Sequence, residues 1–330
     1  MILSTKIGIR QISAILTSLA ATDVTIFIFN MSSALQSDAK REASILGFFD
    51  RQLFQHPTPI PSSVDVKGRA ALVTGANVGL GFEALRQLLQ LGVSHGILGV
   101  RSRAKGDAAA DVLRKEFPKA RIDVMIVDME SYESIRAFVA QCGSLARLDV
   151  VILNAGMQTV KFELNPDTGH EKTIQINYLS TILLSVLLLP VLKAKKQPGE
   201  PARLTIVASD TAFWSKLDPV GPVLSKFDNE KTYDLFPAYS GSKLVLIASV
   251  ATLAEHVNPS DVIVNSVNPG LCAGTELQRE APRVVKFVAS GIVRLLGRNT
   301  KTGASTYINA ALVQGAESHG SYCSEWTIKP

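Results

Sequence analysis

Cysteine is scarce in this chain, and its pattern argues against a disulfide-bonded or metal-bound framework. The 330 residues include only three cysteines, Cys142, Cys272 and Cys323. Their number is odd, and neither a CxxC pair nor a Cys/His ligand spacing is present. We therefore expect free thiols in a reducing, cytoplasmic compartment, and no metal site.

Charged residues are also few, and they are not gathered into a basic surface. They make up 19% of the chain, with a formal net charge of +5. The longest basic cluster, residues 193–196, follows an apolar segment and has no aromatic residues between its lysines. Cations at the end of a helix complement its dipole. Because nucleic-acid binding requires a clustered basic face, this composition argues against that function.

Hydrophobic residues, by contrast, are abundant at 46% of the chain, which is enough to bury a sizeable core. No internal repeat of fixed period is apparent. A chain of this length and composition is typical of one α/β domain with extensions.

The first 30 residues contain an apolar run whose purpose the sequence leaves open. Residues 12–21 follow Lys6 and Arg10, as the hydrophobic region of a signal peptide does. Asp23 interrupts the run, whereas a membrane-spanning helix needs about 20 apolar residues. Three interpretations remain: a signal-like segment, a membrane anchor formed by residues 7–29, or an untranslated stretch if synthesis starts at Met31.

A polar segment follows and ends in a stretch rich in proline. Prolines in residues 56–61 remove backbone donors and favour extended geometry, so this stretch cannot hold a helix. We expect residues 1–66 to be an N-terminal extension and residues 67–330 to form the catalytic domain.

Short apolar runs alternate with amphipathic segments through that domain. The runs predicted to be buried strands are residues 70–74, 97–100, 123–127, 150–153, 203–208 and 262–267. The segments predicted to be helices include residues 81–91, 104–117, 132–145 and 173–192. This alternation predicts the α/β class, with a Rossmann-type, doubly wound parallel sheet in a single domain.

A glycine-rich turn lies between the first predicted strand and the first predicted helix. Its sequence over residues 74–81 is TGANVGLG. Glycines permit a tight turn and close backbone approach to a pyrophosphate, which the helix N-terminus then binds through its free amides. The predicted cofactor-binding residues in this turn are Gly75, Asn77, Gly79, Leu80 and Gly81.

The end of the second predicted strand indicates which dinucleotide binds. An acidic residue there would bind the ribose 2′-hydroxyl of NAD. The chain has Arg101 instead, and a guanidinium matches the oxygens of a 2′-phosphate. We therefore expect NADP(H) as the cofactor.

Tyr239 and Lys243 are spaced to share one face of a helix. A free tyrosine has a pKa of about 10, which is too high for a good base at neutral pH. A nearby cation favours the phenolate and lowers that pKa. This spacing therefore predicts an acid–base pair.

Four motifs, taken in order, resemble the short-chain dehydrogenase/reductase family over about residues 66–323. They are the glycine turn, Asn-Ala-Gly at residues 154–156, the Tyr239–Lys243 element and Asn-Pro-Gly at residues 268–270. The resemblance implies that Tyr239 transfers the substrate proton and that Lys243 also holds the nicotinamide ribose. It further implies that Ser209 polarises the substrate oxygen and that Asn177 helps to hold a proton-relay water.

The resemblance also implies residues that contact the cofactor. Asp128 would lie near the adenine, Asn154 beneath the cofactor, and Pro269 and Gly270 against the nicotinamide. For Asn154 a second interpretation stays open, in which its amide simply ties two strands together. Relatives are often dimers or tetramers, so a homo-oligomer is expected.

The segment between Ser209 and Tyr239 is longer than in compact family members and rich in aromatic residues. In this it resembles the retinol-dehydrogenase-like branch, and it predicts a largely apolar small-molecule substrate. We expect an NADP(H)-dependent reductase or dehydrogenase that acts on a carbonyl or secondary alcohol, with a place in fungal secondary metabolism. The alternatives are an inactive dinucleotide-binding scaffold or sensor, and an enzyme held at a membrane by residues 7–29.

Overall fold

The computed structural model describes residues 35–275, 293 and 296–330 of the chain. The proposed anchor, signal-like segment and alternative start at Met31 therefore lie outside the described residues. So does most of the segment between residues 275 and 296.

One mostly parallel sheet forms the centre of the molecule, with the order β3-β2-β1-β4-β5-β6-β7-β8. Only the β7–β8 pair is antiparallel in the described sheet. The first six strands match the predicted runs, and β7 and β8 were not predicted. The strands are β1 (Ala70–Thr74), β2 (His95–Val100), β3 (Arg121–Ile126), β4 (Val150–Leu153), β5 (Ala202–Val207), β6 (Val262–Asn268), β7 (Tyr322–Ser324) and β8 (Thr327–Lys329).

The strand order reverses between β1 and β4, which places a crevice at the carboxyl end of these two strands. Strands β1, β4 and β6 are buried along their whole length. Near-continuous apolar sequence is typical of parallel strands that are covered on both faces. The predicted doubly wound fold is confirmed.

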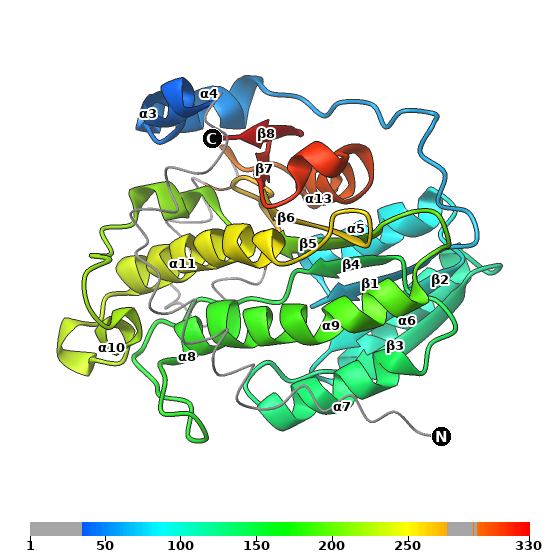
Figure 1. Ribbon diagram of the computed structural model, residues 1–330, viewed down its shortest axis with the longest axis horizontal. Helices are drawn as coiled ribbons and strands as arrows, with labels where there is room; N and C mark the ends of the chain where they lie inside the picture. Colours follow the sequence, from blue (N-terminus) through cyan, green and yellow to red (C-terminus); the bar gives the residue numbers. More distant parts are fainter. Residues whose placement is uncertain (1–34, 276–292, 294–295) are drawn as a thin grey trace.

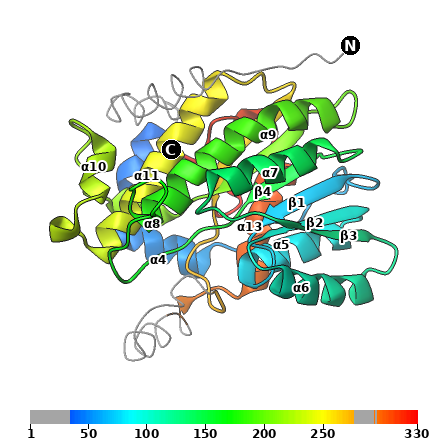
Figure 2. The ribbon, with the colours of Figure 1, turned by 90° about the horizontal axis from the view of Figure 1, so that it is seen from below.

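Helices cover both faces of the sheet (Figure 2). One layer contains α7 (Tyr132–Gly143), α9 (Thr181–Lys195) and α11 (Leu235–Glu255), and the other contains α5 (Gly79–Gln90), α6 (Arg103–Glu116) and α13 (Thr300–Ile308). Alternate residues of β1 enter the two resulting cores: Leu72 packs into the first, and Ala71 and Val73 into the second. Each fully buried leucine or valine contributes about 1.5–3 kcal/mol.

Two long apolar helices, which carry predicted catalytic residues, belong to the first core. One runs from Lys172 to Lys195 through α8 (Lys172–Ile174), the π-helical segment η2 (Gln175–Ser180) and α9; the other is α11. Both are long and apolar enough to cross a membrane by length and composition, but 67% of the most apolar window of each is buried. Burial against the sheet accounts for their hydrophobic character.

The described part of the N-terminal extension is helical and contacts the rest of the fold. Helices α3 (Ala39–Glu42) and α4 (Ile45–Phe54) lie beside the C-terminal β7–β8 hairpin (Figure 1). Ser44 caps α4 by accepting a hydrogen bond from the Gly47 amide at 2.9 Å. The division into an extension and a catalytic domain stays a prediction, but residues 36–54 are not detached from the domain.

Short helical segments complete the described elements. They are η1 (Gln36–Asp38), η3 (Asp210–Trp214), α10 (Val223–Phe227), η4 (Glu230–Thr232), η5 (Asn309–Val313) and η6 (Ala316–Ser318).

Candidate active site

The glycine turn has the backbone geometry that a dinucleotide cradle needs. Gly75 and Gly79 have φ values of 67° and 59°, in the left-handed region that glycine adopts without strain. A Cβ atom on Gly81 would lie 2.5 Å from Asn154 Nδ2 and 2.6 Å from the Gly75 carbonyl oxygen. The turn is therefore packed so closely that no side chain fits at Gly81.

Helix α5 begins in this turn without a side-chain cap. Its N-cap residue, Val78, is extended and makes no capping hydrogen bond. Such a helix N-terminus offers amides and a favourable dipole to a phosphate. The half-buried Asn77 and Leu80 flank it, and Leu80 packs against the second core. This part of the structure fits the pyrophosphate of a dinucleotide.

Asn154, directly after β4, ties three elements together. Its side-chain Nδ2 donates to the Thr74 carbonyl oxygen at 2.9 Å, and its backbone N–H donates to Thr74 Oγ1 at 3.0 Å. Tyr307 donates its hydroxyl to Asn154 Oδ1 at 3.2 Å. These contacts support the strand-tying interpretation, and a direct cofactor contact of Asn154 stays a prediction.

Arg101 and Asp128 follow neighbouring strands, β2 and β3, and meet at the same edge of the sheet. Arg101 Nη1 lies 2.9 Å from Glu130 Oε1, and the Glu130 backbone N–H donates to Asp128 Oδ1 at 3.0 Å. Glu130 Oε2 is also 3.6 Å from Lys172 Nζ. Glu130 belongs to no motif in the sequence, and it neutralises part of the positive charge expected here for a 2′-phosphate.

Tyr239 and Lys243 lie on one face of α11, as their spacing predicted. They are only 7% and 5% exposed, respectively. Lys243 Nζ donates to the Val207 carbonyl oxygen at 2.9 Å and lies 5.9 Å from the centre of the Tyr239 ring. The helix therefore holds the ammonium beside the phenol, at the carboxyl end of β5.

The pKa values of this pair move in the direction that burial dictates. Burial raises the pKa of Tyr239 to about 12, and a hydrogen bond with Ser209 offsets only part of the rise. Burial also lowers the pKa of Lys243 to about 8. The lowered pKa that the spacing of Tyr239 and Lys243 led us to expect is not found here, because loss of hydration outweighs the opposing effect of Ser209.

Ser209 lies two residues beyond β5, where it reaches Tyr239. Its backbone is extended, and its Oγ accepts hydrogen bonds from the Thr211 backbone N–H at 3.3 Å and from Thr211 Oγ1 at 3.0 Å. These bonds fix the hydroxyl oxygen at the start of η3. The structure thus brings the predicted Ser209 and Tyr239 together.

Asn177 joins this group from η2, the π-helical segment. Its Oδ1 accepts from the Met157 backbone N–H at 2.8 Å, and its Nδ2 donates to the Met157 carbonyl oxygen at 2.9 Å and to Ser242 Oγ at 3.1 Å. A Cβ atom on Gly156 would lie 3.2 Å from Asn177 Oδ1 and 3.6 Å from Lys243 Nζ. Glycine at position 156 therefore lets Asn177 and Lys243 approach each other; the water-relay role stays a prediction.

Pro269 and Gly270 follow β6 at the same edge, and residues from the N-terminal helix hold them. Gly270 has a φ of 76°, and Gln52 of α4 hydrogen-bonds to both backbone groups of the next residue, Leu271. No motif in the sequence marks Gln52 or its neighbour Arg51 as a site residue. The available signal was Ser44, a good N-cap residue that precedes an apolar, helix-like run.

The aromatic residues between Ser209 and Tyr239 mostly pack within the protein. Phe227 is buried in the first core, and the Trp214 indole N–H donates to the Ala43 carbonyl oxygen at 2.9 Å. Phe236 is different: it is 44% exposed and precedes Tyr239 by three residues on α11. It is thus an exposed ring on the helix face that carries the phenol.

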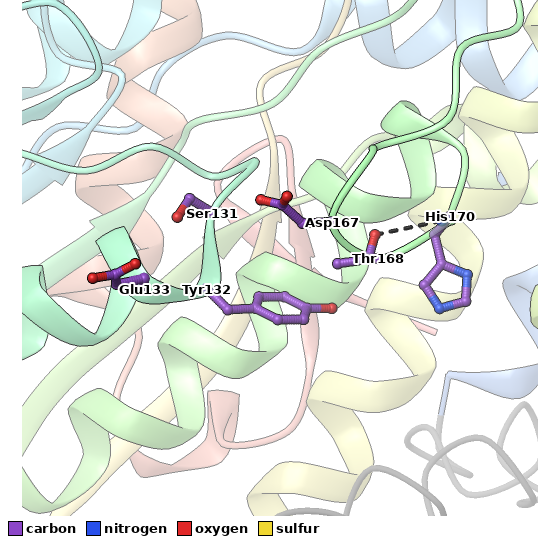
Figure 3. A pocket seen from close by; sticks show the side chains of 6 residues that line it. All are labelled: Ser131, Tyr132, Glu133, Asp167, Thr168 and His170. Carbon is purple, nitrogen blue, oxygen red and sulfur yellow. Dashed lines mark hydrogen bonds between the residues drawn. The ribbon is translucent and has the colours of Figure 1, made fainter.

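A separate pocket of about 400 Å³ lies at the start of α7 (Figure 3). The ring of Tyr132 points toward the segment that carries Thr168 and His170. This pocket includes none of the predicted catalytic residues. Within the described ranges, no group of three or more His, Cys, Asp or Glu residues is placed to hold a metal ion. The lining residues are Ser131, Tyr132, Glu133, Asp167, Thr168 and His170.

Sequence comparison links the chain to known enzymes. Residues 69–213 match the family described as short chain dehydrogenase. Short chain dehydrogenase virL of Hypocrea virens is 50% identical over 304 residues, covering 91% of this chain and 88% of that protein. Short chain dehydrogenase opdN of Penicillium oxalicum is 45% identical over 313 residues, covering 91% of this chain and all of that protein.

Solved structures share the fold at lower identity. L-sorbose reductase from Gluconobacter frateurii, complexed with NADPH and L-sorbose, has a TM-score of 0.61 and 20% identity, covering 79% of this chain and 95% of that one. NADPH-dependent 3-quinuclidinone reductase from Rhodotorula rubra has a TM-score of 0.60 and 23% identity, with coverages of 82% and 96%.

Proposed function

Because this chain belongs to the short-chain dehydrogenase/reductase family of oxidoreductases, we propose that it transfers hydride between NADP(H) and a carbonyl or secondary alcohol. The observation that carries this proposal is the convergence of Ser209, Tyr239 and Lys243 beside the glycine cradle. A proton donor, a group that stabilises an oxyanion and a place for a dinucleotide are what carbonyl reduction requires.

The protonation state of Tyr239 at neutral pH is the one that carbonyl reduction needs. With a pKa raised to about 12, the phenol keeps its proton at neutral pH and can donate it to a carbonyl oxygen. The Ser209 hydroxyl, held next to it, stabilises charge that develops on that oxygen. A bound nicotinamide would supply the hydride.

Lys243 has a complementary task. Its Nζ is anchored to the Val207 carbonyl oxygen and, with a pKa of about 8, is mostly protonated at pH 7. The charge stabilises the phenolate that remains after proton transfer. Asn177, fixed to Met157 and Ser242, keeps η2 and α11 in register around this pair.

Choice of NADP(H) over NAD(H) rests on Arg101. Its exposed guanidinium follows β2, where the adenosine ribose of a dinucleotide is expected. Lys172 lies 3.6 Å from the second oxygen of the Glu130 carboxylate and is paired with Glu163 at 2.7 Å, so the choice depends on Arg101. NADPH is present in solved complexes of fold neighbours, and the 3-quinuclidinone reductase is described as NADPH-dependent, which supports the same choice.

We propose a largely apolar substrate because Phe236 is exposed one turn before Tyr239. The similar fungal proteins support a place in secondary-metabolite biosynthesis. We also propose a cytoplasmic enzyme that forms homo-oligomers. Fractionation of the full chain beside a chain that starts at Met31 would reveal a membrane role for the preceding residues.

The test is NADPH oxidation with a panel of ketones and aldehydes, with Tyr239→Phe as the matched variant. We expect the variant to lose turnover and keep NADPH binding, because only the phenolic hydroxyl is removed. Arg101→Ala should raise KM for NADPH more than for NADH. Binding without turnover by the unaltered protein across the panel would instead indicate an inactive scaffold, and full activity of Tyr239→Phe would refute the proton-donor role.

A further inference from the structure

Two adjacent side chains of α4, Arg51 and Gln52, are buried although their helix lies at the surface. They reach two different loops of the active site. One loop carries Ser209, and the other carries Pro269 and Gly270. The N-terminal helix therefore contacts two loops that carry predicted active-site residues.

Gln52 binds the loop after β6 through both the oxygen and the nitrogen of its side-chain amide. Its Oε1 accepts from the Leu271 backbone N–H at 3.0 Å, and its Nε2 donates to the carbonyl oxygens of Leu271 at 2.9 Å and Leu296 at 2.8 Å. A Cβ atom on Gly270 would lie 2.9 Å from Gln52 Oε1. The amide thus holds the turn at Gly270 through hydrogen bonds from both its oxygen and its nitrogen.

Arg51 enters a buried group of carboxylates next to Ser209. Its Nη2 lies 3.6 Å from Asp210 Oδ2, its Nε lies 3.4 Å from Glu325 Oε2, and its Nη1 lies 2.9 Å from Glu42 Oε2. Burial raises the pKa of Asp210 to about 6, and the charge of Arg51 opposes that rise. Arg51 therefore helps to keep the residue beside Ser209 ionised.

A strained turn presents one of these carboxylates. Glu325 and Trp326 form the β7–β8 turn with φ values of 48° and 60°, a region that residues other than glycine seldom adopt. Arg298 supports the turn, with Nη1 at 3.4 Å from Glu325 Oε1 and its guanidinium over the Trp326 ring. Buried ion groups are weak contributors to stability, and strained residues of this kind cluster at functional sites. Both facts favour a positioning role over a purely stabilising one.

We propose that Arg51 and Gln52 are positioning residues for hydride transfer. Gln52 fixes the turn that carries Pro269 and Gly270, and Arg51 holds Asp210, the first residue of η3, in whose first turn Thr211 holds the Ser209 hydroxyl. The inference rests on the proposed function, which supplies the roles of Ser209 and of the loop after β6.

The experiment uses four point variants of the full chain and one matched control. Arg51→Met and Gln52→Leu remove the polar groups, and Arg51→Lys and Gln52→Asn are the conservative versions. Arg41→Met is the control, because Arg41 pairs with Asp50 near the same helix but the two side chains are 73% and 45% exposed. The dissociation constant of NADPH, kcat, the substrate KM and the urea midpoint are measured for each.

We expect the two positions to affect different constants. Gln52→Leu should weaken NADPH binding, and Arg51→Met should lower kcat with little change in NADPH binding, each by about 10- to 100-fold, since displacements near 1 Å have effects of this size. Arg51→Lys should recover part of kcat, and Gln52→Asn part of the binding. The Arg41→Met control should match the unaltered protein.

A purely structural role predicts lower urea midpoints without a split between binding and kcat, and that result would overturn the inference. If a polar-group deletion does not fold, the conservative variant at the same position decides: unchanged constants would refute its role. Absence of turnover in the unaltered protein would count against the proposed function instead. The Gln52 variants would still decide their part, because NADPH binding needs no substrate.

Discussion

Replacement of Lys243 by methionine should make the protein more stable while it abolishes turnover. The lysine is almost fully buried, and burial lowers the pKa of its ammonium from 10.5 to about 8. One pKa unit corresponds to about 1.4 kcal/mol, so a charged Lys243 lowers the free energy of unfolding by about 3 kcal/mol at neutral pH. Methionine has a similar length and carries no charge.

One hydrogen bond is lost in the exchange. Lys243 Nζ donates to the Val207 carbonyl oxygen, and because the donor is charged, loss of that bond offsets about 2 kcal/mol. The expected net gain in the Lys243→Met variant is therefore about 1 kcal/mol at pH 7.

The pH dependence of this gain has a definite sign. Below pH 8 the lysine is protonated in both the folded and unfolded states, so the full penalty applies. Between pH 8 and pH 10.5 the folded state releases its proton first, and the penalty shrinks as the pH rises. The advantage of the variant should be constant below pH 8 and fade toward pH 10.5.

Urea unfolding of the unaltered protein and of Lys243→Met at pH 7, 9 and 10.5 measures this advantage directly. Lys119→Met is the matched control because Lys119 is exposed, and it should leave stability unchanged at every pH. A stability difference that grows above pH 8, or a variant less stable than the unaltered protein at pH 7, would refute the reasoning. NADPH oxidation by the same samples should show that the gain in stability accompanies loss of activity.

Three further results follow from the packing. Gly81→Ala should abolish NADPH binding, measured by fluorescence titration, because the added Cβ collides with Asn154 and the Gly75 carbonyl; Gly143→Ala, with no atom within 4 Å of its added Cβ, should bind normally. Asn154→Ala should lower the free energy of unfolding in urea by about 2–4 kcal/mol, because it leaves the Thr74 carbonyl and the Tyr307 hydroxyl without partners. A chromogenic disulfide should react with the thiols only after unfolding, since burial raises the pKa of each to about 12: Cys142, Cys272 and Cys323.

The sheet could be predicted because its signals are local. Each of β1 to β6 is an apolar run bounded by turn residues, and the runs alternate with helical periodicity. Strands β7 and β8 have three residues each, and their connecting turn places Glu325 and Trp326 where a hairpin normally has glycine or asparagine. No local pattern in the sequence predicts such a hairpin.

The site could be predicted as far as its residues belong to motifs. Gly81, Asn177, Ser209 and Tyr239 were all found in this way, and the structure brings the last three to one place. Gln52 contacts Leu271 across 219 positions of sequence, and spacing carries no signal over such distances. Contacts of this kind become visible only when the fold is known.

The pKa of Tyr239 shows why spacing alone misjudged the electrostatics. A tyrosine and a lysine one helical turn apart predict attraction, but the sequence does not report how much water either group loses. In the folded protein that loss dominates for both groups, and it raises one pKa while it lowers the other. At neutral pH the result is an uncharged phenol beside an ammonium group whose pKa is only slightly above that pH.

This arrangement suits an acid that must act repeatedly. A phenol that keeps its proton at neutral pH is ready to donate it, and the adjacent cation gains most of its effect once the phenolate has formed, because burial strengthens the attraction between the two charges. The free-energy cost of burying the Lys243 charge is thus present before the reaction. Attraction between the ammonium and the phenolate offsets that cost once the proton has been transferred. The protein is therefore less stable than it would be with an apolar residue at position 243. The buried apolar residues of α9 and α11 offset this loss of stability.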